Sequence, residues 1–361
     1  MTNTIAKPRL LYFDVLKGIA IFMVVMGHVL TMCIRDIDRA PLFKFIGELH
    51  MPLFFFISGW FTMSFSAQGQ MKRPRIGSRA KQLLIPMVVV STLWIFYFPY
   101  SGLESPLVST FPGLWLNEWK NGYWFTLILF EIIVVYSALY YLLRKPMRPC
   151  VMALIGLGVW LVLVVIAIVF AHTEISGFAG LTLLATYWPA FFVGALASRY
   201  RERFEALLTS GTFTTIAILV GCFTLYYICW WWEFGNPMLF GISEFHLIIA
   251  RPIFHICLAV VALAIFQPAV NRACNDGSTP RWVRVWTYLG ANSLGIYLLH
   301  YFFLFPLGSL REMTLAMNLG FVPLLLISSL VALVVIVVVC AVIRILAISP
   351  VLSFLLTGKK P

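Results

Sequence analysis

Three ionisable residues in the first long apolar segment have the side chains of a reactive site. The stretch YFDVLKGIAIFMVVMGHV, which starts at Tyr12, contains Asp14, Lys17 and His28. Charged and titratable groups are costly inside a membrane and usually face a protein interior or a wet cavity. A plain membrane anchor would not carry a carboxylate, an ammonium and an imidazole, so these residues indicate a functional segment.

Helical geometry places two of these residues on one face but at different depths. Lys17 and His28 are 11 residues apart, which is about three helical turns and a rise of about 16 Å. They cannot both contact one reacting atom, but they could hold the two ends of one long ligand. Asp14 lies one turn before Lys17 and could pair with it. An ion pair with no further role explains Asp14 and Lys17 equally well.

Polar residues of later segments are expected at the depth of His28. Helical rise places these residues between the outer face and the midplane: Glu48, His50, Glu131, Arg251, His255 and His300. Five segments would then contribute to one cavity open to the outside, with a separate polar entry near Asp14. Each lone histidine could also be structural, and Trp124 is more typical of an interfacial aromatic than of a sugar-stacking residue.

The elements that position these residues are membrane-spanning helices. The chain has 361 residues, of which 61% are hydrophobic and 11% charged, and its mean hydropathy is +0.93. Apolar runs of about 20 residues, enough to cross a bilayer, recur along the chain. We predict an all-α integral membrane protein, a single bundle of about ten transmembrane helices over 10–33, 45–66, 80–100, 123–143, 149–171, 179–198, 211–232, 246–268, 286–306 and 321–347.

The basic residues predict the orientation of this bundle. Of the 26 lysines and arginines, most lie in alternate loops, which the positive-inside rule places in the cytoplasm. Both termini are then cytoplasmic, as an even number of helices requires. The net charge of +12 follows from this topology, so anionic lipid headgroups are the expected partners and nucleic acid is not.

Several other classes of protein have no support in the sequence. There is no GxxxxGK[ST], no GxGxxG after a strand and no HExxH, and the seven cysteines form no CxxC pair. We expect the cysteines to be packing residues and predict no metal site. We also expect no signal peptide and no fused soluble domain, so residues 1–361 would form one transmembrane domain.

Five blocks resemble acyltransferase family 3, the integral-membrane O-acyltransferases. The blocks are FDVLKGIAIFMVVMGH (13–28), HMPLFFFISGWF (50–61), GYWFTLILFE (122–131), WPAFFVGAL (188–196) and LGANSLGIYLLH (289–300). The basic residue, ten intervening residues and histidine of that family correspond to Lys17 and His28. The chain is most similar to the stand-alone sugar O-acetylases of the family.

This resemblance implies a fold, a reaction and a location. The family has a ten-helix core that takes an acyl group, usually acetyl, from cytoplasmic acyl-CoA. Its acceptor is typically a hydroxyl of an extracytoplasmic carbohydrate or of a lipid-linked glycan. For this chain it implies a multi-pass protein of the bacterial inner membrane, with acetyl-CoA as donor substrate and no tightly bound cofactor.

The resemblance and the helical geometry together assign roles. O-acyl transfer needs a base to take the hydroxyl proton, and we predict His28 for this role, with Lys17, oriented by Asp14, binding the donor. Further donor-binding candidates follow the second helix: Arg73, Arg75, Arg79 and Lys81. Candidates for binding the acceptor or orienting His28 are Glu48, His50, Trp124, Glu131 and His300.

Two other functions fit part of this pattern. A transporter of a lipid-linked sugar or a small acid would also need polar groups in an outward cavity, but it would not use acyl-CoA. A structural membrane protein would tolerate loss of Lys17 and His28. Within the acyltransferase interpretation, the sequence leaves open the acceptor, the choice of acetyl or succinyl, and direct transfer or an acyl-enzyme.

Overall fold

The structure is a computed structural model that describes residues 10–33, 41–66, 70–97, 119–170, 173, 179–233, 251–275, 277–304, 310, 312–314, 317 and 319–358. Over these ranges the chain is almost entirely helical, and the only β pairing there is an isolated bridge between Phe65 and Met71. The predicted all-α class is confirmed. The helices are α1 (Leu11–Cys33), α2 (Pro41–Thr62), α3 (Ile76–Tyr97), α5 (Trp119–Ala138), α6 (Tyr140–Leu143), α7 (Pro149–Val169), α9 (Leu181–Arg199), α10 (Arg201–Thr209), α11 (Gly211–Glu233), α13 (Arg251–Ala273), α14 (Arg281–Ala291), α15 (Ser293–Leu299), η5 (His300–Phe303), α17 (Phe321–Leu346) and α18 (Pro350–Thr357).

Several of these helices meet the requirements for crossing a bilayer. Among the described residues, α1, α7, α9, α13 and α17 are long and apolar enough, and α10 with α11 adds a sixth span if that pair, bent by 80°, is counted as one. The protein is therefore a multi-pass membrane protein. The count of ten spans and the cytoplasmic position of both termini stay predictions, since residues 1–9 and 359–361 lie outside the described ranges.

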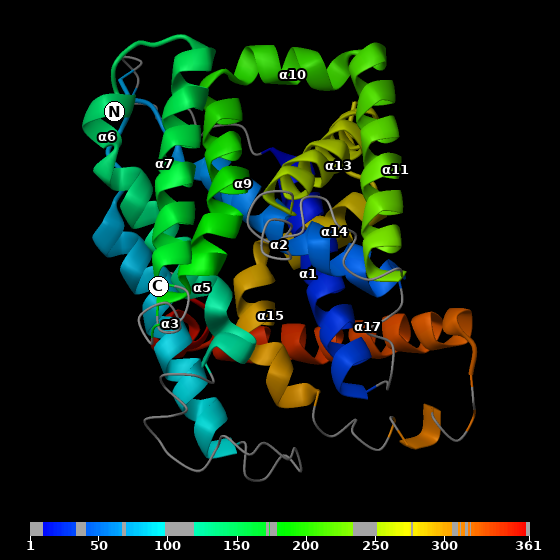
Figure 1. Cartoon of the computed structure of the whole chain (residues 1–361). Coiled ribbons are helices and arrows are strands. Elements are labelled where there is room, and N and C mark those ends of the chain that lie inside the picture. The colour runs from blue at the N-terminus through cyan, green and yellow to red at the C-terminus, as the bar shows by residue number, and fades with distance from the viewer. Residues whose placement is uncertain are drawn as a thin grey trace.

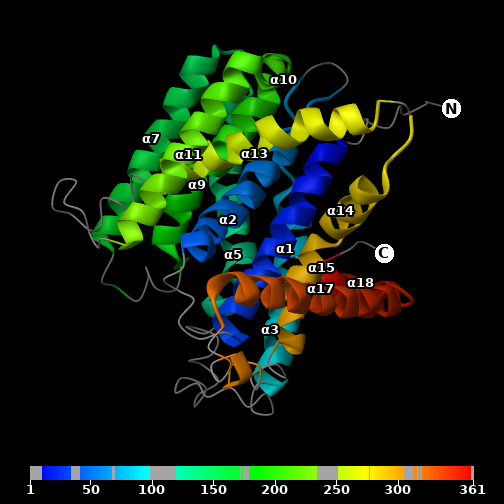
Figure 2. The same ribbon diagram turned by 90° about the vertical axis from the view of Figure 1, so that its right-hand side faces the viewer.

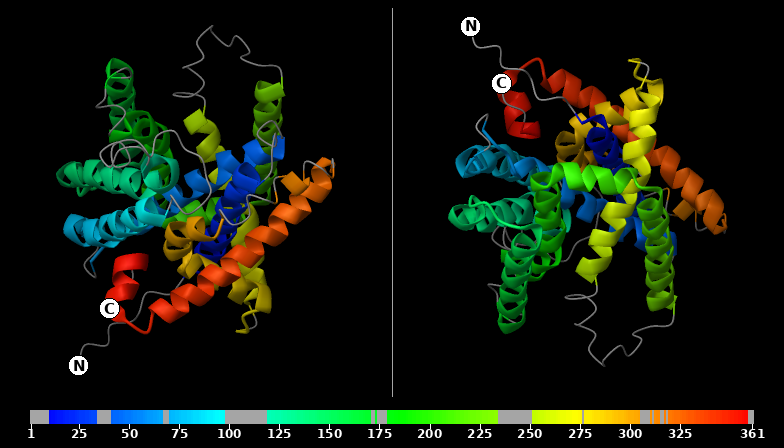
Figure 3. Two further views of the ribbon diagram at one scale, coloured as in Figure 1. Left: turned by 90° about the horizontal axis from the view of Figure 1, so that it is seen from below. Right: turned by 90° about the horizontal axis from the view of Figure 1, so that it is seen from above.

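The helices surround α1. In Figure 1, α7 and α9 stand side by side, α10 runs across the top from α9 to α11, which stands beside α13, and α17 runs across the lower part of the molecule. Figure 2 shows α1 between α13 and α14, with α2 beside it. Viewed from above, α1 is seen nearly end-on close to the centre, bordered by α10, α13 and α14 (Figure 3). We call the end of the bundle that carries α10 the α10 face.

Glycines allow α1 and α14 to touch along their backbones. A Cβ added to Gly18 would clash with the carbonyl oxygen of Trp286, and one added to Gly290 would clash with that of Asp14. The same reciprocal arrangement joins α2 to α9, where Gly59 meets Phe191 and Gly194 meets Phe56. Lipid provides no hydrophobic driving force for helices to associate, so close van der Waals packing at small residues stabilises helix crossings instead. These crossings fix the position of Asp14 and Lys17 against α14.

One predicted span is broken. The sequence predicts a continuous helix over 286–306, but α14 ends at Ala291 and α15 begins at Ser293. The break is at Asn292, whose side-chain amide donates a hydrogen bond to the carbonyl oxygen of Tyr288 at 2.8 Å. Asparagine competes for backbone groups in this way and disfavours a continuous helix. After the break, α15 and η5 run beside α1 and bring His300 to the level of His28.

Two short helices were not predicted, and one predicted boundary matters for the site. The predicted segments do not include α10 and α18, which are too short to cross a bilayer. The start of α3 is Ile76 rather than residue 80, so basic residues expected in a loop lie on a helix.

Candidate functional site

The Asp14–Lys17 pair marks the entry to the site at the α10 face. Lys17 Nζ lies 2.7 Å from Asp14 Oδ1, which confirms that the two side chains pair. Asp14 is nearly buried and Lys17 is about a quarter exposed. The ammonium of Lys17 is therefore neutralised in part, but it still reaches the open space beside α1.

Lys17 lines two adjoining cavities. We call the first, of about 900 Å³, the entrance cavity; it is lined by Leu10, Asp14, Lys17, Trp60, Phe61, Met63, Ser64, Phe65, Ser66, Ser198, Arg199, Arg201 and Ala291. We call the second, of about 290 Å³, the inner cavity; it is lined by Lys17, Met51, Phe54, Ile57, Ser58, Phe61, Thr62, Arg79, Gln82, Leu83, Phe125, Leu129, Ile133, Ser293, Leu294 and Tyr297. Both contain Lys17 and Phe61, so the two cavities meet at these side chains.

The two cavities differ in chemistry. The entrance cavity has three basic side chains, of Lys17, Arg199 and Arg201, against one carboxylate. Arg199 already donates to the carbonyl oxygen of Leu143 and, at 2.6 Å, to that of Lys145. Part of its guanidinium therefore links the end of α9 to residues 143–145. The inner cavity is mostly apolar, with a few hydroxyl and amide groups. A cationic entrance cavity that adjoins an apolar inner cavity suits a ligand with an anionic group at one end and a long apolar arm.

Of the four basic residues predicted to bind the donor after the second helix, one lines a cavity and three do not. Arg79 lines the inner cavity and donates to Gln82 Oε1 at 3.1 Å. Arg73, Arg75 and Lys81 are exposed and line neither cavity. Because α3 begins before Arg79, residues of one helical face, including Arg79 and Leu83, point into the cavity together.

His28 lies deeper along α1, in contact with residues of η5. Its Nε2 is 2.9 Å from the hydroxyl oxygen of Tyr301, and the two share a hydrogen bond. The ring centroid of His300 is 5.2 Å from that of His28 and 4.2 Å from that of Tyr301. His28 and His300 were both predicted site residues, and the fold brings them together.

The hydrogen bonds of His300 define which of its nitrogens is protonated. Nδ1 lies 2.8 Å from the carbonyl oxygen of Tyr297 and 3.1 Å from that of Ile296. Carbonyl oxygens only accept, so Nδ1 carries the hydrogen. In the neutral ring, Nε2 then keeps its lone pair, and it is buried with no hydrogen-bond partner in the described part of the chain. His300 therefore holds a free basic nitrogen beside His28.

Tyr297 connects the inner cavity to the histidines. It lines the cavity, and its ring centroid lies 6.3 Å from that of His300. Its hydroxyl donates to the carbonyl oxygen of Gly122 at 2.7 Å and accepts from the Phe125 amide at 3.3 Å. These bonds tie α15 to α5 and hold Tyr297 between the inner cavity and His300, which does not itself line that cavity.

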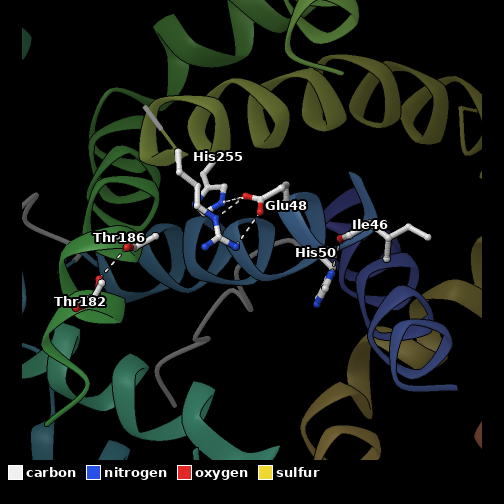
Figure 4. A network of polar contacts seen from close by, with 7 residues as sticks. Ile46, Glu48, His50, Thr182, Thr186 and His255 are labelled. Atoms are coloured by element: carbon white, nitrogen blue, oxygen red, sulfur yellow. Dashed lines mark hydrogen bonds and ion pairs between the residues drawn. The ribbon is translucent and has the colours of Figure 1, made fainter. Parts of the chain in front are cut away.

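A second polar group joins α2 to α13. Glu48 binds Arg251 with both carboxylate oxygens, each at 2.8 Å, and its Oε2 is 2.6 Å from Nε2 of His255. His255 Nδ1 is buried without a partner among the described residues. Figure 4 shows Glu48 reaching His255 while His50 points away from both. Ion pairing satisfies this buried carboxylate, which would otherwise be costly in a membrane.

The remaining predicted acceptor residues lie in three different places. Trp124 stacks on Tyr187, whose ring stacks in turn on His255 at 5.3 Å, so Trp124 adjoins the Glu48 group. His50 donates from Nδ1 to the carbonyl oxygen of Ile46 at 2.5 Å.

Glu131 is separate from both groups. It is two residues from Leu129 and from Ile133, which line the inner cavity, so it projects from the opposite side of α5. Its Oε2 is buried with no partner in the described ranges.

Two tyrosines of the site and two arginines of the entrance cavity were not predicted from the sequence. Tyr297 and Tyr301 lie in an apolar run, where an aromatic residue is typical of a core position. Their spacing from His300 was the available signal, since all three are within one helical turn. Arg199 and Arg201 follow the predicted helix over 179–198, among the basic residues of the alternate loops, and were not predicted as site residues. The described residues contain no group of three or more histidines, cysteines or acids arranged to hold a metal.

Comparisons with known proteins show which family the chain belongs to. Residues 10–344 match the family described as acyltransferase domain. Nodulation protein NolL of Sinorhizobium fredii is 36% identical over 129 residues, which cover 33% of this chain and 34% of that protein. Nodulation protein NolL of Mesorhizobium japonicum is 33% identical over 146 residues, which cover 36% of this chain and 38% of that protein.

The alignments with these two relatives cover about a third of the chain, whereas the family match covers nearly all of it. The chain spans little more than a third of the length of the curated relatives it matches. No solved structure matches it. The family match covers nearly the whole chain and confirms the family predicted from the five sequence blocks. This chain therefore belongs to the acyltransferase domain family and is a multi-pass membrane protein.

Proposed function

We propose that this enzyme transfers an acyl group, acetyl in the first instance, from acyl-CoA to a hydroxyl of a carbohydrate or lipid-linked glycan. The observation that carries the proposal is the pair of adjoining cavities that leads from the Asp14–Lys17 pair to Tyr297, beside the histidines. The donor would enter from the α10 face and the acceptor from the opposite side.

The donor fits the order of the two cavities. Its phosphates would contact Lys17, Arg199 and Arg201 in the entrance cavity, since these cations favour anionic groups. Its pantetheine arm would lie in the apolar inner cavity, whose hydroxyl and amide groups match the amides of the arm. Arg79 would bind near the point where the two cavities meet. The thioester would then lie at the Tyr297 end.

His28 is the proposed general base. It would take the proton of the acceptor hydroxyl as that oxygen forms a bond to the thioester carbonyl carbon. The carbonyl electrons move to oxygen and give a tetrahedral oxyanion, which returns them and expels the CoA sulfur. The protonated ring of His28 then gives its proton to the sulfur. The same base also serves a route through an acyl-enzyme.

Tyr301 and His300 would position and stabilise this base. Both ring nitrogens of a protonated histidine are donors, and the hydroxyl oxygen of Tyr301 can accept from Nε2 at the observed 2.9 Å. His300 offers the lone pair of Nε2 as a second acceptor next to the reacting groups. The Glu48 group joins α2 to α13, adjoins Trp124 and lines neither cavity, and we assign it to holding or orienting the acceptor.

The topology and location belong to the same proposal. We infer that the α10 face is cytoplasmic, because Arg199, Arg201 and Arg203 lie there and basic residues favour that side. Ten spans with both termini in the cytoplasm, in a bacterial inner membrane, would place acyl-CoA at the entrance cavity.

Turnover of the purified protein tests the proposal. Detergent-solubilised protein is incubated with radiolabelled acetyl-CoA and an envelope carbohydrate extract, and CoA release and label transfer are followed by chromatography. We expect transfer by the wild type and its loss in His28→Ala of equal yield. Transport of a lipid-linked sugar or small acid without any consumption of acyl-CoA would support the alternative function, a transporter.

A further inference from the structure

A third cavity opens next to the entrance cavity and has no role in the account above. We call it the side cavity. Its volume is about 240 Å³, and α1, α10 and α13 enclose it with Leu10, Leu11, Tyr12, Arg201, Glu205, Gln267, Val270, Asn271 and Cys274. Leu10 and Arg201 also line the entrance cavity, so the two spaces are neighbours.

The side cavity contains a buried amide with an unused hydrogen-bonding atom. Gln267 is 4% exposed, and its Oε1 has no hydrogen-bond partner among the described residues. Asn271 lies one turn further along α13 and lines the same cavity, which places two carboxamides on one face. Leaving a buried polar atom unpaired is unfavourable. A ligand with its own donors and acceptors would satisfy these amides.

The charge of the side cavity distinguishes it from the entrance cavity. Arg201 Nε lies 2.8 Å from Glu205 Oε1, so the one cation of the side cavity is paired with its one carboxylate. The lining is therefore electrically balanced. The entrance cavity keeps an excess of positive charge even with Arg201 paired, because Lys17 and Arg199 face a single carboxylate there, that of Asp14. Phosphates favour the entrance cavity, and a neutral polar group favours the side cavity.

We propose that the side cavity binds the adenine of the acyl-CoA donor. The inference rests on the proposed function, because it assumes acyl-CoA in the entrance cavity. Carboxamides suit adenine, which presents an amino donor beside a ring-nitrogen acceptor. The amino group would donate to Gln267 Oε1, and the amide of Asn271 would donate to a ring nitrogen. Tyr12, Leu10 and Leu11 supply flat or apolar surface for the ring.

A donor that lacks adenosine tests this assignment. We compare acetyl-CoA with S-acetyl-4′-phosphopantetheine, using wild type and Gln267→Leu. Leucine has a similar volume and no polar atom, so it removes an unpaired group and the variant should fold. We expect Gln267→Leu to raise KM for acetyl-CoA about fivefold, the loss of roughly one hydrogen bond. Its KM for acetyl phosphopantetheine should equal that of the wild type.

Two further variants complete the experiment. Asn271→Ala should show the same selective effect, and it changes an exposed residue that does not support the core. Arg272→Ala is the matched control, since Arg272 is the next residue along α13 and does not line the cavity. It should leave both KM values unchanged.

The possible outcomes separate this inference from the proposed function. If neither Gln267→Leu nor Asn271→Ala distinguishes the two donors while the wild type turns both over, the side cavity binds water only and the inference is wrong. If the wild type turns over neither donor, the proposed function itself fails.

Discussion

Replacing Tyr301 with phenylalanine removes one hydroxyl from the side of His28 and leaves the ring in place. The Tyr301 oxygen is 2.9 Å from His28 Nε2, and the Tyr301 side chain is 6% exposed, so water does not readily replace it. The ring of Tyr301 also packs on Trp94 and Tyr123, and phenylalanine would keep these contacts. The substitution therefore tests the hydrogen bond with little change in packing.

The magnitude follows from the change in charge of His28 during the reaction. A hydrogen bond between neutral groups contributes about 0.5–1.5 kcal/mol, and one to a charged group about 1.5–3 kcal/mol. Only the difference, about 1.5 kcal/mol, lowers the barrier, because the neutral bond already exists in the ground state. Tyr301→Phe should therefore reduce kcat about tenfold. KM for acetyl-CoA should not change, since Tyr301 lines neither the entrance nor the inner cavity.

The assay is steady-state CoA release by purified protein, and Tyr123→Phe is its control. Tyr123 is equally buried and packs on Tyr301 at 5.6 Å, but its hydroxyl has no hydrogen-bond partner in the described part of the chain. Tyr123→Phe should keep wild-type kcat. Equal kcat values for the two variants would refute the reasoning that Tyr301 stabilises protonated His28.

Three further substitutions test the cavities and the fold. Arg79→Ala should raise KM for acetyl-CoA about tenfold in the same assay, because Arg79 lines the inner cavity. Arg73→Ala should leave KM unchanged, because Arg73 does not line it. Equal KM values for the two variants would show that Arg79 does not bind the donor. Gly18→Ala should abolish a monodisperse peak in detergent size-exclusion chromatography, because the added Cβ would clash with the backbone of α14. Gly27→Ala is the control and should keep the peak, because a Cβ added there meets no neighbouring atom within 4 Å. A normal peak for Gly18→Ala would contradict the close crossing. Glu48→Ala leaves the half-buried Arg251 and the buried His255 without their carboxylate partner. It should destabilise the protein by about 1.5–3 kcal/mol, seen as a lower melting temperature. An unchanged melting temperature would show that this ion pair does not stabilise the fold.

Periodicity was sufficient to predict the part of the site that lies on α1. Residues 11 positions apart share a helical face in any straight helix, so Lys17 and His28 could be related before the fold was known. His300 was predicted at the level of His28, and the structure places the two ring centroids 5.2 Å apart, while their depth in a membrane stays a prediction. The shared face of Lys17 and His28 is a local property, and the unbroken helix α1 retains it.

The partners of these residues depended on contacts between distant segments. Tyr301 is 273 positions from His28 in the chain, and no pattern within either segment predicts that they meet. Arg79 could not be separated from its neighbours, because the start of α3 and its packing decide which basic side chain enters the cavity. The break at Asn292 was equally hidden, since one polar residue in an apolar run gives only a weak local signal.

We propose that His28 acts as the base in acyl transfer to an envelope carbohydrate. The most direct measurement is mass spectrometry of surface glycans from cells that produce either the wild type or His28→Ala at equal membrane levels. We predict a mass increment of one acyl group in the first sample and its absence in the second. Glycans with the same increment in both samples would contradict the claim.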